Sequence, residues 1–185
     1  MKICTKLYLY LLLGLFVTSA VAHADDGQSS GQASGHSSGY SSGQDDIVKR
    51  LLAKVEGQTL PSISVDIPEV SLNRSIPDPA AETEMAYILQ KLGFRLIDVE
   101  ATNELADIEV SGEAFSEFGL RKGNLVSTKA RVEIKALSRD SGVVLVDRET
   151  AVAVDLSPEI AGKIALAKAS ANLTERLVTA VLALN

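Results

Sequence analysis

The sequence predicts an α/β protein of the α+β type, with a mixed, largely antiparallel sheet covered by two main helices. Strict alternation of apolar and polar residues over 125–137 predicts a half-buried strand. A turn at 140–142 leads into a second strand, 143–155, so the two should form an antiparallel hairpin. Apolar residues at helical spacing over 79–92, and in the alanine-rich segment that follows Ser157, predict the two helices.

The N-terminus has the pattern of a secretory signal peptide. Two lysines precede an apolar run over 7–21, and residues 22–24 (Ala-His-Ala) form a small-x-small cleavage site. We therefore expect a signal peptide over 1–24, cleaved in a mature protein of the periplasm. The run is shorter than the ~20 residues of a spanning helix, so we expect no transmembrane segment after cleavage. Cys4 lies ahead of the run and not at the cleavage site, so no lipid anchor is expected.

Residues 25–45 differ sharply in composition, and we expect them to form a flexible Gly/Ser-rich tether. A four-residue repeat places a glycine at every fourth position from Gly27 to Gly43. Without large aliphatic side chains, the segment cannot bury enough apolar surface to offset the ordering of its backbone. Two interpretations stay open: a spacer that holds the folded body away from a membrane or partner, and a terminus without a specific use.

The segment 46–57 is predicted to be an amphipathic helix. Asp45 or Asp46 is a suitable N-cap, and Gly57 ends the helix. A helix this short is marginal by itself, so its apolar stripe must dock on another surface. We favour docking on its own domain over a partner-binding helix displayed on the tether. The stripe consists of Ile47, Val48, Leu51, Leu52 and Val55.

Residues 58–185 are expected to form a single α/β domain. Pro68 interrupts the first extended segment, and Pro79 lies in the first turn of the helix that Gly93 closes. Ser157 as N-cap and Pro158 at the first helical position open a last helix that reaches nearly to the C-terminus. The remaining predicted elements are an extended strand over 63–72 that Pro68 bends or confines to an edge, strands over 94–99 and 108–115, and a short helical turn over 102–106.

The composition excludes several classes of function. The chain has a net charge of −6, and loss of the signal peptide with its two lysines makes it more acidic. An acidic surface repels phosphate, so nucleic acid is not an expected partner. After residue 24 there is no cysteine or tryptophan and only one histidine, His36. Thiol nucleophiles, Ser-His triads and common zinc or haem sites therefore lack their side chains, and we expect no cofactor, metal or enzymatic activity.

Several segments together are similar to one group of bacterial envelope proteins. They are residues 92–94 (Leu-Gly-Phe) leading to Asp98, residues 106–112, residues 131–144 and the alanine-rich last helix. Their order and spacing resemble the curli-assembly, penicillin-binding-protein-activator and flagellar-assembly-T group of periplasmic domains, over roughly residues 60–183. The resemblance implies an anticodon-binding-domain-like fold that assists assembly at the outer membrane or cell wall without catalysis. Curli-secretion and activator members are lipoproteins, whereas this chain has no lipidation cysteine, and pore formation is not expected.

The segment 115–124 links two predicted strands and is the candidate partner-binding loop. Long connections on a rigid sheet often carry partner sites. Here Phe118 and Leu120 stand beside a basic pair, Arg121 and Lys122, that is conspicuous in an acidic chain. The alternative interpretation is a wide hairpin whose Phe115 and Leu120 fold back on the core.

We expect a non-catalytic periplasmic assembly or scaffolding protein that binds an envelope protein partner of the flagellar, curli-type or cell-wall machinery. Outer-membrane association, oligomerisation and the identity of the machine are left open. The alternative function is a carboxylate-dependent cell-wall or glycan hydrolase, since paired carboxylates can cleave glycosidic bonds. A purely structural secreted protein is a third class. The carboxylates considered for hydrolysis are Asp98, Glu100, Asp107, Glu109 and Glu113.

Overall fold

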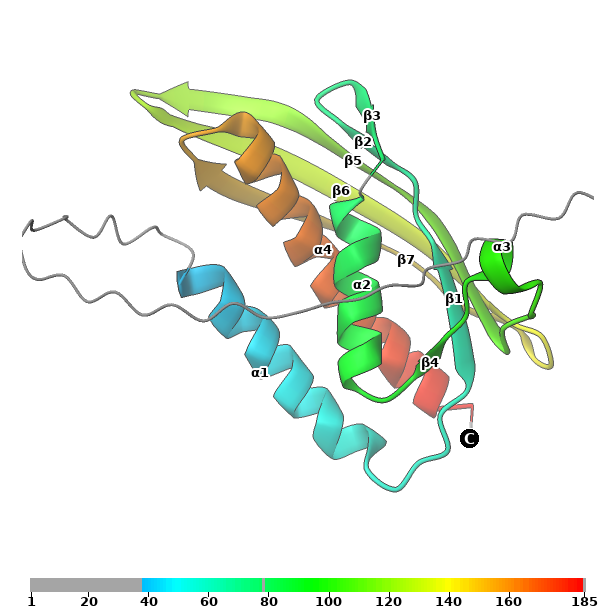
Figure 1. The fold of residues 1–185 in the computed structure, drawn as a ribbon. Coiled ribbons are helices and arrows are strands. Elements are labelled where there is room, and N and C mark those ends of the chain that lie inside the picture. Colours follow the sequence, from blue (N-terminus) through cyan, green and yellow to red (C-terminus); the bar gives the residue numbers. More distant parts are fainter. Residues whose placement is uncertain (1–37, 78, 185) are drawn as a thin grey trace, which may run out of the picture. The chain divides into compact units, whose positions relative to one another are not determined.

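The described part of the chain is a mixed seven-stranded sheet with helices packed on one of its faces (Figure 1). The structure is a computed structural model, and it describes residues 38–77 and 79–184. The predicted signal peptide, residues 25–37 of the predicted tether and His36 lie outside the described residues. The elements are α1 Ser38–Val55, β1 Ser62–Asp66, β2 Glu69–Ser71, β3 Arg74–Ile76, α2 Ala80–Lys91, β4 Arg95–Leu96, α3 Val99–Thr102, β5 Ile108–Lys122, β6 Leu125–Ser138, β7 Gly142–Asp155 and α4 Pro158–Leu182.

The long strands β5, β6 and β7 form an antiparallel meander, which confirms the predicted hairpin and the predicted fold class. In β6 every second side chain points toward the helices and is buried, as the alternation predicted. Val132 on that face lies opposite Ala114 of β5 and Glu149 of β7. The helix-facing residues of β6 are Val126, Thr128, Ala130, Val132, Ile134 and Ala136.

The short strands extend the sheet on the other side of β5. Strand β1 pairs in parallel with the start of β5, and β2 pairs in parallel with a later segment of the same strand. Pro68 lies between β1 and β2, at the interruption that the sequence predicted. Strand β3, which the sequence did not predict, pairs antiparallel with β2, and β4 pairs in parallel with β1.

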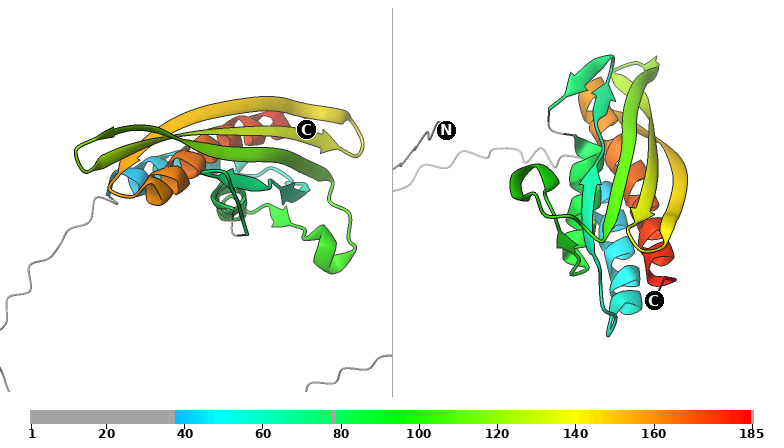
Figure 2. Two further views of the ribbon diagram at one scale, coloured as in Figure 1. Left: turned by 90° about the horizontal axis from the view of Figure 1, so that it is seen from above. Right: turned by 90° about the vertical axis from the view of Figure 1, so that its right-hand side faces the viewer.

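Helices α2 and α4 are the two main helices of the prediction, and they lie with α1 on the same face of the sheet (Figure 2). The Ser157 hydroxyl accepts a hydrogen bond from the Ile160 N–H, so the predicted N-cap of α4 is confirmed. Gly162 lets α4 approach the sheet closely, because a Cβ there would lie 3.1 Å from the Ser116 Oγ. No helix within residues 38–77 and 79–184 is long and apolar enough to cross a membrane.

The region after α2 differs from the prediction. The expected strand over 94–99 is reduced to the two residues of β4, and the short helix α3 begins at Val99 and not at residue 102. The Asp98 carboxylate accepts a hydrogen bond from the Ala101 N–H at 2.9 Å, which starts the helix earlier. Asn103 in the left-handed region ends it, with φ of 54°.

Helix α1 begins at Ser38, ahead of the predicted N-cap, so residues 38–45 are helical where the sequence predicted the end of a flexible tether. The Gln44 side chain donates a hydrogen bond to Glu84 of α2, and this tertiary contact compensates for poor local helix propensity. The predicted docking of the apolar stripe on its own domain is confirmed for Ile47, Leu51 and Val55, which are buried in the core, and for Val48, which packs against it. Leu52 is exposed, so it is not part of the docked stripe.

Candidate interaction surface

The segment predicted to be a loop is the end of a long hairpin. Strand β5 continues to Lys122, and Gly123 and Asn124 form the turn to β6. Gly123 has φ of +62°, a conformation that glycine adopts without strain. Lys122 pairs directly with Leu125. The prediction of a partner-binding loop at 115–124 is therefore wrong in its conformation, because the pairing of β5 with β6 extends through the segment.

A β-bulge interrupts this hairpin and directs Leu120 outward. Between the pairs Phe118–Thr128 and Arg121–Val126, two residues of β5 lie opposite the single residue Ser127. The Leu120 N–H donates to the Ser127 Oγ at 2.9 Å. Leu120 is 74% exposed and so does not fold back on the core. Phe115 also points away from the helices, where the Arg131 guanidinium lies 5.9 Å from its ring centroid.

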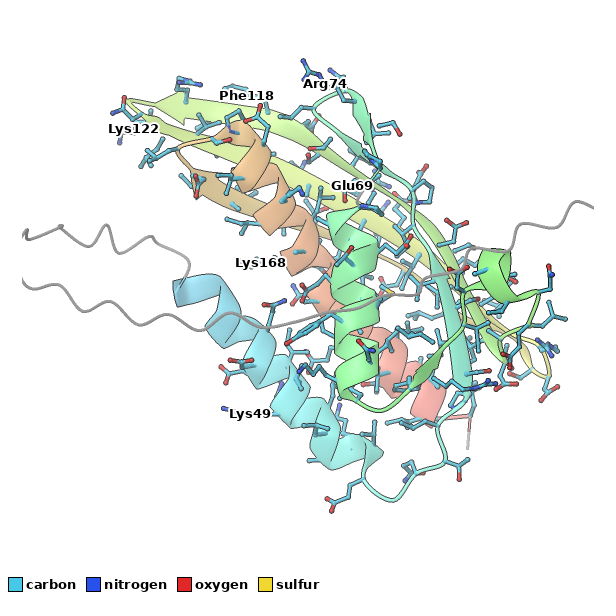
Figure 3. The ribbon with its side chains drawn as sticks, in the orientation of Figure 1. Lys49, Glu69, Arg74, Phe118, Lys122 and Lys168 are labelled. Carbon is cyan, nitrogen blue, oxygen red and sulfur yellow. The ribbon has the colours of Figure 1, made fainter. Side chains whose placement is uncertain are left out.

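The register divides the four predicted site residues between the two faces of the hairpin. Phe118 and Arg121 pair with Thr128 and Val126, so they lie on the helix-bearing face. Leu120 and Lys122 belong to the open face. All four side chains are exposed, and Figure 3 shows Phe118 and Lys122 near the free end of the hairpin. The structure therefore brings Leu120 and Lys122 together and separates them from the other two.

Two further leucines lie beside this pair. Val126 pairs with Asp155, the last residue of β7, so Leu125 and Leu156, the next residues along the two chain segments, lie at the same end of the sheet. Leu125 is 50% exposed and Leu156 is 69% exposed. We call Leu120, Lys122, Leu125 and Leu156 the tip patch. It joins a bulge in β5, the first residue of β6 and the connection from β7 to α4.

Sequence reasoning missed Leu125 and Leu156 for different reasons. Leu125 is the first residue of the predicted strand 125–137, one position before its alternating apolar residues begin at Val126. Leu156 directly precedes the N-cap Ser157, a position where an apolar residue often packs against the first turn of the helix. Its high exposure shows that this packing is largely absent here. Only the pairing of β6 with β7 reveals that the two leucines lie at the same end of the sheet.

The carboxylates considered for hydrolysis do not form one group. Asp98, Asp107 and Glu109 line an open hollow of about 1110 Å³ between β1, α2 and the start of β5. Glu113 lines a different, shallow depression on the open face of the sheet. The side chain of Glu100 lies outside the described residues. Three of the five considered carboxylates are therefore brought together.

Three of the carboxylates around the hollow, Asp98, Asp107 and Glu82, hold structural hydrogen bonds. Asp107 accepts from the Ser62 N–H at 2.8 Å and from the Ser62 hydroxyl at 2.6 Å. These bonds lower the pKa of Asp107, and the nearby Arg139 acts in the same direction. Asp98 caps α3, and Glu82 on the opposite wall accepts from the Ile67 N–H at 2.9 Å. A lowered pKa keeps Asp107 ionised and unsuited to act as the protonated general acid of a glycosidase.

The part of the chain that the structure describes contains no group of three or more His, Cys, Asp or Glu residues placed to hold a metal ion. The predicted absence of a cofactor and of catalysis stays a prediction.

No family model and no curated protein match the chain. Among solved structures it is similar to the hypothetical protein CT253 from Chlamydia trachomatis, with a TM-score of 0.46 and 11% identity, over 66% of this chain and 98% of that one. It is also similar to a minor lipoprotein from Acinetobacter baumannii, with a TM-score of 0.45 and 12% identity, over 63% of this chain and 92% of that one. Similarity at this level does not indicate what the chain does. The resemblance to the curli-assembly, activator and flagellar group stays a prediction.

Proposed function

We propose that this chain is an exported, non-catalytic protein of the bacterial envelope that binds a protein partner through the tip patch. The observation that carries the proposal is that three exposed leucines, Leu120, Leu125 and Leu156, lie at the end of the sheet where the β5–β6 hairpin turns. Exposed apolar side chains are common singly, but a contiguous group on a rigid element is typical of an interaction site. The predicted signal peptide supports an envelope location.

The chemistry of the tip patch indicates the kind of partner. The leucines require an apolar surface, and burial of one leucine contributes about 1.5–3 kcal/mol when it is complete. Lys122 at the edge of the patch favours a partner that places carboxylates beside its apolar residues. The acidic character of the chain as a whole disfavours nucleic acid. We therefore propose a protein partner with an apolar patch bordered by Asp or Glu, in an envelope assembly machine of the resembled group.

A photo-crosslinking experiment in cells that express the full chain can identify this partner. A photoreactive residue replaces Leu156 in the tip patch, and the same residue replaces Lys49 of α1 as a control. Lys49 lies on an exposed helix face away from the hairpin (Figure 3). We expect one protein to be cross-linked through position 156 and not through position 49. Equal cross-linking at both positions, or none at position 156, would contradict the proposal.

The two faces of the hairpin then supply a matched pair of variants for titration with the purified partner. Lys122→Glu reverses a charge within the tip patch, whereas Arg121→Glu reverses the neighbouring charge on the helix-bearing face. We expect Lys122→Glu and Leu125→Ser each to raise the Kd about tenfold or more, equivalent to about 1.4 kcal/mol. Arg121→Glu should change the Kd little. If both charge reversals weaken binding equally, the tip patch is not the binding surface.

A further inference from the structure

Strand β7 is a long edge strand. It spans 14 residues and pairs with β6 alone among the described strands. Figure 2 shows it at the border of the sheet. Its second edge therefore presents backbone N–H and C=O groups that no described strand pairs, a template for another strand. At Arg148 the N–H donates to the Asp147 carboxylate at 2.7 Å, and the C=O accepts from the Arg176 guanidinium at 3.3 Å. The strand contains no proline, which would block such pairing.

The outer face of β7 is apolar where an exposed edge is usually polar. Val146, Val152 and Val154 are 68%, 54% and 55% exposed and lie on the face away from the helices. The helix-bearing face of the same strand carries Asp147 and Glu149, which form ion pairs with Arg176 of α4. A half-buried strand ordinarily places its large apolar residues toward the helices and its charges toward water. In β7 the three exposed valines instead share the outer face with Arg148 and Thr150, whereas Asp147 and Glu149 lie on the helix-bearing face among Leu145, Ala151 and Ala153.

The sequence of β7 allows the strand to pair with a second, antiparallel copy of itself. When two copies run antiparallel with Thr150 opposite Thr150, each Val146 lies opposite Val154 of the second copy. In this register Arg148 lies opposite Val152, and on the helix-bearing face Asp147 and Glu149 lie opposite Ala153 and Ala151.

Shifted registers bring like charges together. Centring the pairing on Glu149 places two glutamates opposite each other, and centring it on Ala151 places Asp147 opposite Asp155. Like charges directly opposite each other are destabilising. The register centred on Thr150 avoids such pairs and covers all three exposed valines.

We propose that two copies of this chain associate through β7, antiparallel about a two-fold axis at Thr150, so that one sheet continues through both copies. An isologous contact of this kind uses the same strand twice and closes the assembly at a dimer. The pairing satisfies the free backbone groups of the edge, replaces the side-chain bonds of Arg148 and covers the outer valines. It does not depend on the tip patch.

Single-cysteine cross-linking tests the register directly. The chain expressed in full, with Cys4→Ser to remove its only native thiol, receives either Thr150→Cys or Arg148→Cys. Directly opposite residues have Cα atoms about 4.5–5.5 Å apart, which suits a disulfide. The two copies of residue 148 would instead be offset by about 13 Å along the strands. We expect mild oxidation to convert Thr150→Cys to a disulfide-linked dimer and to leave Arg148→Cys unlinked.

The oligomeric state of the unmodified chain provides the second measurement. Sedimentation equilibrium should show a dimer, and Val152→Lys with Val154→Lys should raise its dissociation constant at least tenfold. Circular dichroism of this variant should remain that of the folded protein, because both side chains are already exposed in a single copy.

A chain that stays monomeric at all concentrations would overturn the proposal. A dimer that cross-links equally through position 148, or that the two lysines leave intact, would also overturn it. Lys122→Glu should leave the dimer unchanged, which separates this proposal from the function of the tip patch.

Discussion

The hydroxyl of Ser127 on β6 accepts a hydrogen bond from the backbone N–H of Leu120 on β5, with 2.9 Å between the two atoms. The β-bulge leaves this N–H outside the regular β5–β6 ladder, and the Ser127 hydroxyl serves as its acceptor. Gly119 makes the geometry feasible, because a Cβ at that position would lie 2.7 Å from the Ser127 Oγ. The outward direction of Leu120 in the tip patch therefore depends on these two neighbours.

Replacing Ser127 with alanine should loosen the bulge without unfolding the protein. The loss of a single exposed hydrogen bond lowers the free energy of unfolding by about 0.5–1 kcal/mol. The Leu120 N–H should become less protected in amide hydrogen exchange, while the N–H groups of the β6–β7 ladder keep their protection. Ser111→Ala on the same open face is the control, and an equal change in that variant would contradict the role of Ser127.

Gly112 lies where β5 and β6 approach closely, and alanine at this position should be strongly destabilising. An added Cβ would lie 2.2 Å from the backbone oxygen of Glu133, which cannot move without distorting β6. Overpacking of this kind typically costs about 1–3 kcal/mol, and the backbone clash places Gly112→Ala at the upper end. Urea unfolding measures the change.

Gly43 supplies the opposite case in the same protein. It lies within α1, and an added Cβ would meet no atom within 4 Å. Gly43→Ala should therefore raise the free energy of unfolding by about 0.5–1 kcal/mol, since alanine is the better helix former. A destabilising Gly43→Ala would show that residues 38–45 are not helical in solution.

The long elements could be predicted from the sequence because one face of each is buried along most of its length. The alternation in β6 and the helical spacing in α2 and α4 report this burial directly. Strand β3 spans only three residues, and the first turns of α1 contain Gly39 and Gly43. These elements depend on pairing with β2 and on contact with α2, which a local pattern does not contain.

The candidate site could be predicted only in part for the same reason. A basic pair beside apolar residues is conspicuous in the sequence, and it predicts Leu120 and Lys122 together with Phe118 and Arg121. Leu125 and Leu156 join them through the registers of two strand pairs. In β7 the structure turns the small Ala151 toward the helices, where α4 packs, and leaves Val146, Val152 and Val154 exposed.

The ion pair between Arg50 of α1 and Glu175 of α4 predicts a pH-dependent contribution to stability. The Arg50 Nε and Nη2 donate to the two carboxylate oxygens of Glu175 at 3.1 Å and 2.9 Å. This bonding from Arg50 lowers the pKa of Glu175. A carboxyl whose pKa is lower in the folded state stabilises the protein above its unfolded pKa, and this stabilisation is lost as the pH falls through the folded pKa.

Because the pair is solvent-accessible, Glu175→Gln should cost only about 0.2–1 kcal/mol at neutral pH. The difference between the variant and the wild type should disappear at a pH well below about 4.3, the usual pKa of a glutamate. Urea unfolding at the two pH values measures it. A difference that persists in acid would mean that packing of the side chain, and not its charge, stabilises the contact.

Glu69 on β2 should be the carboxylate most important for stability, because it caps a helix that has no local cap. Pro79 at the start of α2 makes no side-chain capping bond, and the Glu69 Oε2 instead accepts from the Ala80 and Ala81 N–H groups at 2.7 and 3.2 Å. Glu69 is 2% exposed, so its removal leaves these groups without a strong acceptor.

Hydrogen bonds to a charged group contribute about 1.5–3 kcal/mol, and we expect Glu69→Ala to lower the free energy of unfolding in urea by at least this much, with a smaller loss for Glu69→Gln. Glu117→Gln on the exposed face of β5 should cost almost nothing, and equal losses at the two positions would disprove the capping role.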